Sequence, residues 1–316
     1  MNIDVQSFIR AKAANPITSL NILNGTPKGR LTRDLKATLP TNELKSNLNA
    51  SHSDCPISNL HRHRRILVFD VETTGLIPKP TYETEMLNSA NPLNQLLIAK
   101  TKQKVPPPIE AYPHILQLSY IIYNLGQRNI EETYNAYVNV NESIDISEKI
   151  TEITGITRQI CTERGIHLVD ALAKFAEAYS RCDFIVAHNM DFDSAAINAE
   201  MRRHGIEHTM FLPADSGKLY CTMKNSIHIC NIMVDRKRPK PSVEGQVQTQ
   251  APISQYKKFP KLSELYQHLF GIVPENLHNS LIDTLVCLRC LLKIRFHMEI
   301  PDVRFAHLLS DSLKIS

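Results

Sequence analysis

Alternating apolar and polar stretches divide much of this chain into short strands. The apolar, β-branched run ILVFDV at 66–71 predicts a buried strand, and HILQLSYIIYN at 114–124 predicts a second. TYNAYVNV at 133–140 alternates and predicts a third strand. DFIVAHN at 183–189 predicts a further buried strand, and KLYCTM at 218–223 a short edge strand.

Helices are predicted where apolar residues recur at helical spacing, most clearly in LVDALAKFAEAYS at 168–180. The other predicted helices are ISEKITEITG (146–155), DFDSAAINAEMRRHG (191–205), KLSELYQHLFG (261–271) and HNSLIDTLVCLRCLLKI (278–294), of which the first three end at a glycine. Three strands followed by alternating helices and strands predict a mixed α/β sheet, not a helical bundle or a β-sandwich.

Several stretches fall outside this pattern. Residues 1–64 are basic, rich in Asn, Ser, Thr and Lys, and predict a disordered extension. We expect one domain over 65–297, with insertions at about 77–113, which is punctuated by proline, and at 232–259, which is basic. Residues 298–316 are expected to form a C-terminal tail, for which the pattern indicates no role.

Composition narrows the class of protein only a little. In a chain of 316 residues, 42% hydrophobic residues suffice for a core, and a net charge of +4 permits a polyanionic partner without demanding one. No apolar run approaches the roughly 20 residues of a membrane span, so no membrane partner is expected. The first residues lack the apolar centre of a secretory signal, whereas organelle targeting by the basic extension stays open.

The cysteines and one histidine cluster favour ordinary explanations. Seven cysteines without framework spacing predict a reducing, intracellular compartment, either cytoplasm or nucleus. Cys287 and Cys290 form a CxxC inside an apolar helix, which favours helix packing over a metal or redox role. HRHRR at 61–65 favours a solvated charge cluster over a nucleic-acid contact, and Cys55 nearby lacks enough partners for zinc.

Two carboxylates end the first predicted strand. Asp70 and Glu72 are two residues apart, so a strand places both on the same side of the sheet. Adjacent anions at a strand end repel each other and need a compensating cation. Hard divalent ions with oxygen ligands supply one.

A second polar cluster, AHNMDFD at 187–193, stands where a buried strand passes into a helix. Asp193 falls in the first helical turn, where a carboxylate suits the helix dipole. Asn189 or Asp191 would serve as well as a helix cap, and for these two residues that alternative is good. Capping does not explain why His188 and Asp193 gather there too.

The third cluster is HNSLID at 278–283. His278 precedes a helix, and Asp283 interrupts its apolar face, where an unpaired carboxylate is expensive. Taken alone, His278 would more often be a surface or capping histidine.

Together FDVETTG, AHNMDFD and HNSLID resemble, in order, the three motifs of the DEDDh exonuclease family, which includes RNase T-like enzymes and polymerase proofreading subunits. The resemblance covers about residues 66–294, including EITGIT at 152–157, CTM at 221–223 and FPKLSELYQHLFG at 259–271. Ser280 stands where alanine is usual, and both insertions are larger than usual.

The resemblance implies an RNase H-like fold with a five-stranded mixed sheet flanked by helices. It implies that two Mg²⁺ or Mn²⁺ ions are held by four carboxylates and that His278 is the general base; the ligands would be Asp70, Glu72, Asp193 and Asp283. Substrate contacts would come from Thr73, Thr74, Leu76 and Asn189, although Thr73 and Thr74 could instead form a turn with Gly75.

The expected function is 3′→5′ hydrolysis of DNA in proofreading, repair or degradation, with single-stranded 3′ ends as the partner. Two alternatives stay open: an exoribonuclease of the RNase T-like type, and a catalytically silent scaffold for nucleic acid or a polymerase. No polymerase-binding motif is recognisable, and the pattern does not indicate an oligomeric state.

Overall fold

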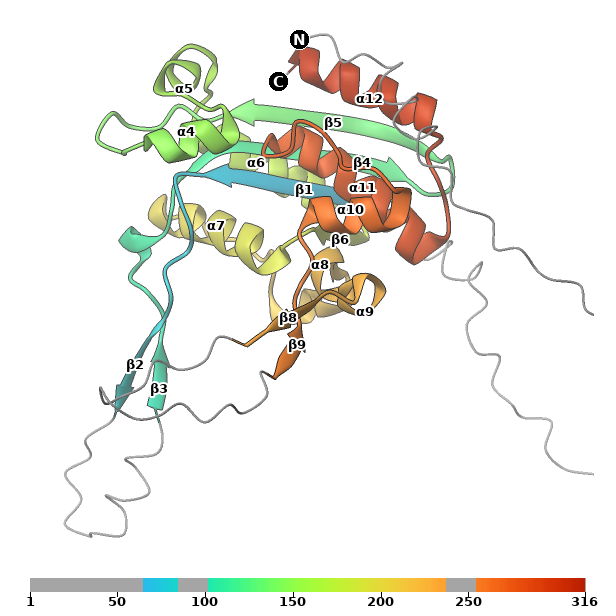
Figure 1. The fold of residues 1–316 in the computed structure, drawn as a ribbon. Helices are drawn as coiled ribbons and strands as arrows, with labels where there is room; N and C mark the ends of the chain where they lie inside the picture. Colours follow the sequence, from blue (N-terminus) through green and yellow to red (C-terminus); the bar gives the residue numbers. More distant parts are fainter. Residues whose placement is uncertain (1–64, 85–101, 237–253, 316) are drawn as a thin grey trace, which may run out of the picture.

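A computed structural model describes residues 65–84, 102–236 and 254–315 (Figure 1). Its centre is a five-stranded sheet in the order β5-β4-β1-β6-β7. The strands are β1 (Arg65–Thr73), β4 (Ile115–Asn124), β5 (Asn129–Tyr137), β6 (Phe184–Ala187) and β7 (Leu219–Cys221). β1, β4 and β5 pair antiparallel, whereas β6 and β7 continue parallel from β1. The expected mixed five-stranded sheet is confirmed.

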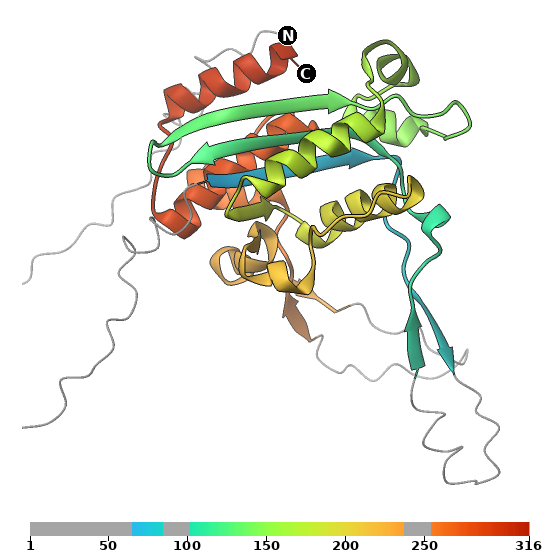
Figure 2. The same ribbon diagram turned by 180° about the vertical axis from the view of Figure 1, so that it is seen from behind.

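Helices cover both faces of this sheet, as the RNase H-like expectation requires (Figures 1 and 2). On one face lie α6 (Leu168–Ser180) and α7 (Met190–Arg203), and on the other lie α10 (Leu262–Phe270) and α11 (Ser280–Phe296). Shorter elements are α4 (Glu148–Thr154), α5 (Arg158–Arg164), α8 (Thr222–Asn225), α9 (Ile227–Cys230) and the 3-10 turns η1 (Ile109–Ala111) and η2 (Pro213–Gly217). The predicted glycine stops hold at Gly155 and Gly271, whose φ values of 73° and 77° are left-handed.

Alternation along β1 assigns its side chains to the two faces. Leu67, Phe69 and Val71 pack in the cluster with α6 and α7, whereas Ile66 and Val68 pack in the cluster with α10 and α11. Residues with even numbers therefore point toward α11. The carboxylates at 70 and 72 follow the same alternation, so the strand itself delivers them to the α11 side.

Both expected insertions contain a two-stranded ribbon that the sequence pattern did not predict. β2 (Thr81–Thr84) pairs with β3 (Lys102–Val105), and β8 (Met233–Asp235) pairs with β9 (Gln255–Lys257). The two ribbons project on the same side of the sheet in both views (Figures 1 and 2). The middle of each insertion, like the whole 1–64 extension, lies outside the described residues.

The C-terminal residues do not form a featureless tail, because they contain helix α12 (Asp302–Ile315). Its Phe305 is buried, and the guanidinium of Arg289 lies 4.4 Å from the centre of the Phe305 ring. The same guanidinium donates to the backbone oxygen of Ile300 at 3.1 Å and pairs with Asp302. Because Arg289 belongs to α11, the sequence of residues 298–316 alone could not predict this contact.

The cysteines and the absence of an expected membrane span can both be compared with the described residues. All six cysteines in this part of the chain are free, and Cys287 and Cys290 are buried in α11, where burial raises the pKa of both thiols. Their environment is that of packed helix residues. No helix among the described residues has the length and apolar character to cross a membrane.

Candidate active site

The site forms where β1 extends beyond the end of its pairing with the parallel strand β6. β6 pairs with β1 only through Ile66, Leu67 and Val68, so the backbone of Val71 has no strand partner on that side. The amide of Val71 instead donates to Oδ1 of Asp193 at 3.3 Å. A shortened strand thus leaves a gap through which a carboxylate from α7 reaches the end of β1.

Asp193 is 3% exposed in the first turn of α7, whereas its neighbour Asp191 has another role. The Asp191 carboxylate is exposed and pairs with Lys224 at 2.6 Å. Asn189 occupies the N-cap position of α7, but its side chain makes no capping hydrogen bond. The capping alternative for Asn189 and Asp191 is therefore wrong, and the proposed substrate contact of Asn189 stays a prediction.

The start of α11 brings the third motif to the same place. Asn279 caps this helix, because its Oδ1 accepts from the amides of Leu281 at 3.2 Å and Ile282 at 3.4 Å. His278 is thus not the cap. Its backbone has a left-handed φ of 68°, and its amide donates to Oδ2 of Asp283 at 3.0 Å.

Glu72, His278 and Asp283 come together as a set. One potential ligand atom from each of the three lies within 4.8 Å of the others, and within the described ranges no second such set of three occurs. Asp70 and Asp193 lie outside this tightest set. Their carboxylates are nevertheless close enough to interact electrostatically with it.

Burial raises the pKa of all four carboxylates, and repulsion within the cluster raises it further for Asp70, Glu72 and Asp193. Burial, followed by repulsion from Asp193, Asp283 and Glu72, raises the pKa of Asp70 well above its usual value. Burial is also the main cause that raises the pKa of Glu72 to about 8, of Asp193 to about 8 and of Asp283 to about 7. The site is therefore unfavourable for ionised carboxylates unless a cation joins them.

An orphaned oxygen points to the same cation. Oδ1 of Asp283 is buried and has no hydrogen-bond partner among the described residues, although Oδ2 accepts from His278. A buried carboxylate oxygen without a donor is costly. Oxygen ligands with mutual repulsion and one unsatisfied oxygen fit a hard divalent ion such as Mg²⁺ or Mn²⁺.

Ser280, which departs from the usual family residue, joins the helix to the sheet. Its hydroxyl donates to the backbone oxygen of Asp70 at 2.8 Å, and its amide donates to Oε1 of Gln117 at 3.2 Å. Gln117 is fully buried directly opposite Glu72, and its Nε2 donates to Asn135 at 2.8 Å. Sequence reasoning treated Ser280 as neutral and missed Gln117, since a lone glutamine in an apolar strand carries no chemical signal.

The segment after Glu72 is held by backbone and side-chain hydrogen bonds. The Thr73 hydroxyl donates to the backbone oxygen of Gly75 at 2.7 Å. Thr74 exchanges two bonds of 2.9 Å with the backbone of His114, one of which uses its hydroxyl. Leu76, in contrast, is 85% exposed. The turn with Gly75 thus accounts for the Thr73 hydroxyl only, because the Thr74 hydroxyl accepts from the distant His114 amide. The substrate contacts proposed for these three residues stay a prediction.

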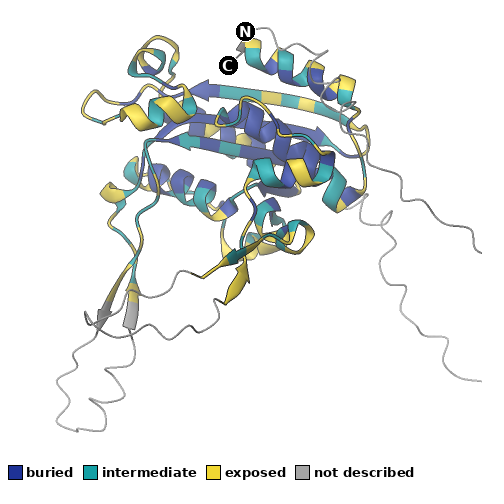
Figure 3. Ribbon diagram, in the orientation of Figure 1, coloured by how far each residue is buried: buried dark blue, intermediate teal, exposed yellow. Residues whose placement is uncertain are grey.

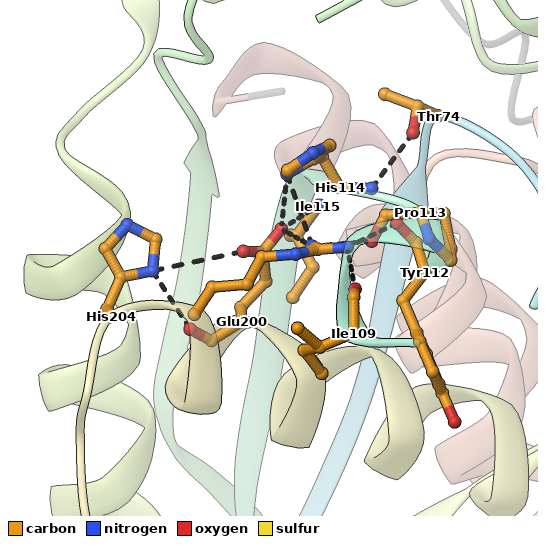
Figure 4. Close-up of polar contacts among 9 residues, drawn as sticks. Thr74, Ile109, Tyr112, Pro113, His114, Ile115, Glu200 and His204 are labelled. Carbon is orange, nitrogen blue, oxygen red and sulfur yellow. Dashed lines mark hydrogen bonds and ion pairs between the residues drawn. The ribbon is translucent and has the colours of Figure 1, made fainter. Parts of the chain in front are cut away.

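Glu200 and Arg203 fix the chain opposite Thr74, and Figure 4 shows Glu200 beside His114 and Ile115. Oε1 of Glu200, a residue that is 1% exposed, lies 3.1 Å from both the Ile115 amide and Nδ1 of His114. Arg203 pairs with Glu200 at 3.1 Å and donates to backbone oxygens of the 109–113 segment. This clamp closes the base of the first insertion directly beside the site.

His188 holds the chain that returns from the second insertion. Its ring is partly buried, and loss of solvation lowers its pKa to about 4, so the ring is neutral at pH 7. Nε2 lies 3.1 Å from the backbone oxygen of Pro260, and Nδ1 lies 2.9 Å from the hydroxyl of Thr222. His188 therefore links the tip of β6 to the returning chain and is a structural histidine.

Comparison with known proteins assigns a family. A family model described as an exonuclease, RNase_T, matches residues 67–291. Among curated proteins none matched this chain.

Several solved nuclease structures are similar in fold at low identity. The nuclease domain of 3'hExo, a DEDDh family member bound to rAMP, is 14% identical with a TM-score of 0.44; the match covers 80% of this chain and 94% of that one. E. coli Exonuclease I with a dT13 oligonucleotide is 15% identical with a TM-score of 0.45, covering 73% and 41%. Cell-death related nuclease 4 is 11% identical with a TM-score of 0.41, covering 81% and 65%.

Proposed function

This chain belongs to the RNase T exonuclease family of DEDDh nucleases, and on that premise we propose that it is a metal-dependent 3′→5′ exonuclease. Its preferred substrate is DNA with a single-stranded 3′ end. The observation that carries the proposal is the approach of Glu72, His278 and Asp283 to within 4.8 Å. Two motifs separated by more than 200 residues of chain would not otherwise place two acids and a histidine together.

Asp70, Glu72, Asp193 and Asp283 would hold two Mg²⁺ or Mn²⁺ ions. The raised pKa values and the orphaned Oδ1 of Asp283 support this assignment. Two bound ions would clamp the attacking and leaving oxygens and make the attacking water more acidic. The amides of Val71 and His278 donate to Asp193 and Asp283 and fix the position of these two carboxylates.

His278 accepts the proton of the attacking water on a ring nitrogen. Its side chain is exposed to the solvent from which the water comes, and its backbone is fixed by the bond to Asp283. Attack at phosphorus releases a nucleotide, and the 3′-hydroxyl of the shortened strand leaves. Thr73, Thr74, Leu76 and Asn189 would contact the terminal nucleotide, with Leu76 as the side chain most open to it.

Phosphate contacts are expected to dominate binding, because no sequence-reading element stands out. The proposed role is in proofreading, repair or degradation inside the cell, in the cytoplasm or nucleus. Exoribonuclease activity and a silent scaffold are the rival functions, and the same assay addresses both.

The test uses 5′-labelled single-stranded DNA, duplex DNA and single-stranded RNA, with Mg²⁺ or with EDTA. We expect a ladder on single-stranded DNA that shortens progressively and that EDTA abolishes. Faster shortening of RNA would assign the ribonuclease function. Binding without any metal-dependent product would favour the scaffold, and a single internal cut or full activity in EDTA would contradict an exonuclease of this kind.

A further inference from the structure

The β8–β9 ribbon carries exposed aromatic and basic side chains that the proposed reaction does not use. Val234 and Tyr256 are directly paired, so both side chains lie on one face of the ribbon. Arg236 follows Val234 by two residues and shares this face. Its guanidinium lies 6.0 Å from the centre of the Tyr256 ring, which belongs to a residue 44% exposed. Figure 3 shows β9 as exposed.

Contacts at both the strand and its base hold the ribbon to the rest of the protein. Lys257 lies on the face opposite Tyr256, and its Nζ is 3.4 Å from Nδ1 of His228 in α9. At the base, the amide of Lys258 donates to the backbone oxygen of Ile232 at 3.0 Å, and the Lys258 ammonium pairs with Glu264. These contacts anchor the ribbon at its base, while the Tyr256 side chain itself is exposed.

The base of the ribbon is tied to the candidate active site. The backbone oxygen of Pro260 bonds to Nε2 of His188, which precedes the α7 turn that carries Asp193. Tyr256 is four residues before Pro260, so even a fully extended chain keeps it within about 14 Å of that anchor. Phe259, which is 50% exposed, stands between them in sequence.

The charge of the ribbon selects the kind of partner. Arg236, Lys257, Lys258 and Lys261 outnumber Asp235 and Glu264 along the described part of the ribbon and its base. An aromatic ring with an adjacent guanidinium among basic residues suits stacked bases and phosphates. A protein partner of apolar character would call for a larger apolar surface with fewer charges at its centre.

We propose that the Tyr256 face of the β8–β9 ribbon, with Arg236, binds the single-stranded nucleic acid whose 3′ end enters the active site. Tyr256 stacks on a base, and Arg236 contacts the neighbouring phosphate. This inference rests on the proposed function for the identity of the strand. The Tyr256 face would be a substrate-binding surface that lies outside the three exonuclease motifs in the sequence.

The experiment compares Tyr256→Ala, Tyr256→Phe and Arg236→Ala in the full chain, with Met233→Ala as the matched control. Met233 is 46% exposed on the opposite face of the same ribbon. Binding of a fluorescent oligothymidine of about 20 nucleotides, longer than common single-strand site sizes, is measured in EDTA. Hydrolysis of thymidine 5′-monophosphate p-nitrophenyl ester, too short to reach the ribbon, is measured with Mn²⁺.

Tyr256→Ala should weaken oligothymidine binding by about tenfold, within the range for loss of one stacked base, while Tyr256→Phe and Met233→Ala bind like wild type. Arg236→Ala should lower the log–log salt slope by roughly 0.7. All four should hydrolyse the nucleotide ester normally. Wild-type binding by Tyr256→Ala, or an equal loss in Tyr256→Phe, would overturn the stacking surface and leave the ribbon to a protein partner.

The binding measurement does not depend on turnover. If wild-type protein hydrolyses neither the ester nor the oligothymidine with Mg²⁺ or Mn²⁺, the proposed function fails, and the EDTA titrations still decide the role of the ribbon. If wild type hydrolyses both while Tyr256→Ala binds and cuts normally, only the ribbon inference fails.

Discussion

The backbone amide of His278 donates to the carboxylate of Asp283 at 3.0 Å, so the histidine and one of the acids of the site hold each other in place. His278 keeps a left-handed φ of 68° to make this bond. For a residue with a side chain that conformation is uncommon. Since the amide makes the bond, a change of side chain at 278 leaves it intact and isolates the role of the imidazole.

We therefore expect His278→Ala to lower turnover by about 10²–10⁴-fold, the usual range for loss of a general base. Metal affinity should stay close to that of wild type, because four carboxylates form the site. Single-turnover cleavage and isothermal titration with Mn²⁺ measure the two quantities. Asn279→Ala is the control, which should cost about 1 kcal/mol of stability as a lost cap and much less turnover. Normal cleavage by His278→Ala would remove His278 from the reaction.

Asp70→Asn, Asp193→Asn and Asp283→Asn should each abolish turnover while the protein stays folded. Each change removes a ligand and a negative charge from a site where the charges repel one another. The comparison variant is Asp191→Asn, because Asp191 pairs with Lys224 away from the cluster. It should retain activity. A gel assay measures cleavage of single-stranded DNA, and circular dichroism checks folding. If one of the three variants keeps a near wild-type rate, the residue it changes is not part of the active site.

Stability of the metal-free protein should fall as pH rises. The folded pKa values of Glu72, Asp193 and Asp283, about 8, 8 and 7, lie above their ordinary values near 4. A raised folded pKa means that the native state holds protons that the unfolded state has released. The stabilisation is complete below about pH 4 and is lost progressively up to about pH 8.

Melting curves in EDTA across this range check the sign, and Mg²⁺ should restore the melting temperature most strongly near pH 8. In EDTA at that pH, Asp283→Asn should melt higher than wild type, by about 2–4 °C for each kcal/mol of repulsion relieved. A melting temperature that rises between pH 5 and pH 8 without metal would contradict the carboxylate cluster.

Ser280→Ala should lower both the stability and the cleavage rate of this protein, although alanine is the usual family residue. The change removes the hydroxyl that donates to the backbone oxygen of Asp70 at 2.8 Å, at a position that is fully buried. Loss of one such bond costs about 0.5–1.5 kcal/mol. Because the bond fixes α11 against β1, we expect a lower rate constant for cleavage with unchanged oligonucleotide affinity.

Thr284→Ala is the matched control for Ser280→Ala, since its hydroxyl donates only to the Ser280 backbone within the same helix. Chemical denaturation and single-turnover rates, measured on both variants, separate a positioning effect from simple destabilisation. Equal effects of the two changes on cleavage would leave Ser280 with a structural role only.

Much of the fold could be predicted because the apolar periodicity of the sheet strands and long helices is regular. The helix at 168–180 has the bounds predicted from its stripe, since its apolar residues all face one cluster. Residues of the first and third motifs lie together at 72, 278 and 283. Asp70 and Glu72 could be placed on one side by strand alternation alone.

What escaped prediction depends on partners far away in the chain. Helix α12 is held by Arg289 of α11, whose charge is buried among aromatic rings. Neither the α11 sequence nor the α12 sequence predicts this contact by itself. Gln117 looked like an ordinary strand residue until Ser280, 163 positions later, was found beside it. The ribbons β2–β3 and β8–β9 have strands of three or four residues, too short to show a period.

Because both insertions are closed at their bases, their length and sequence can vary during evolution. Thr74 and His114 close one base, and Ile232 and Lys258 close the other, so the length of chain beyond each closure scarcely affects the catalytic framework. Doubling a loop that is already closed costs only about 0.6 kcal/mol. Selection can therefore lengthen, shorten or rewrite what lies beyond the closures and retune substrate choice, while the chemistry is inherited untouched.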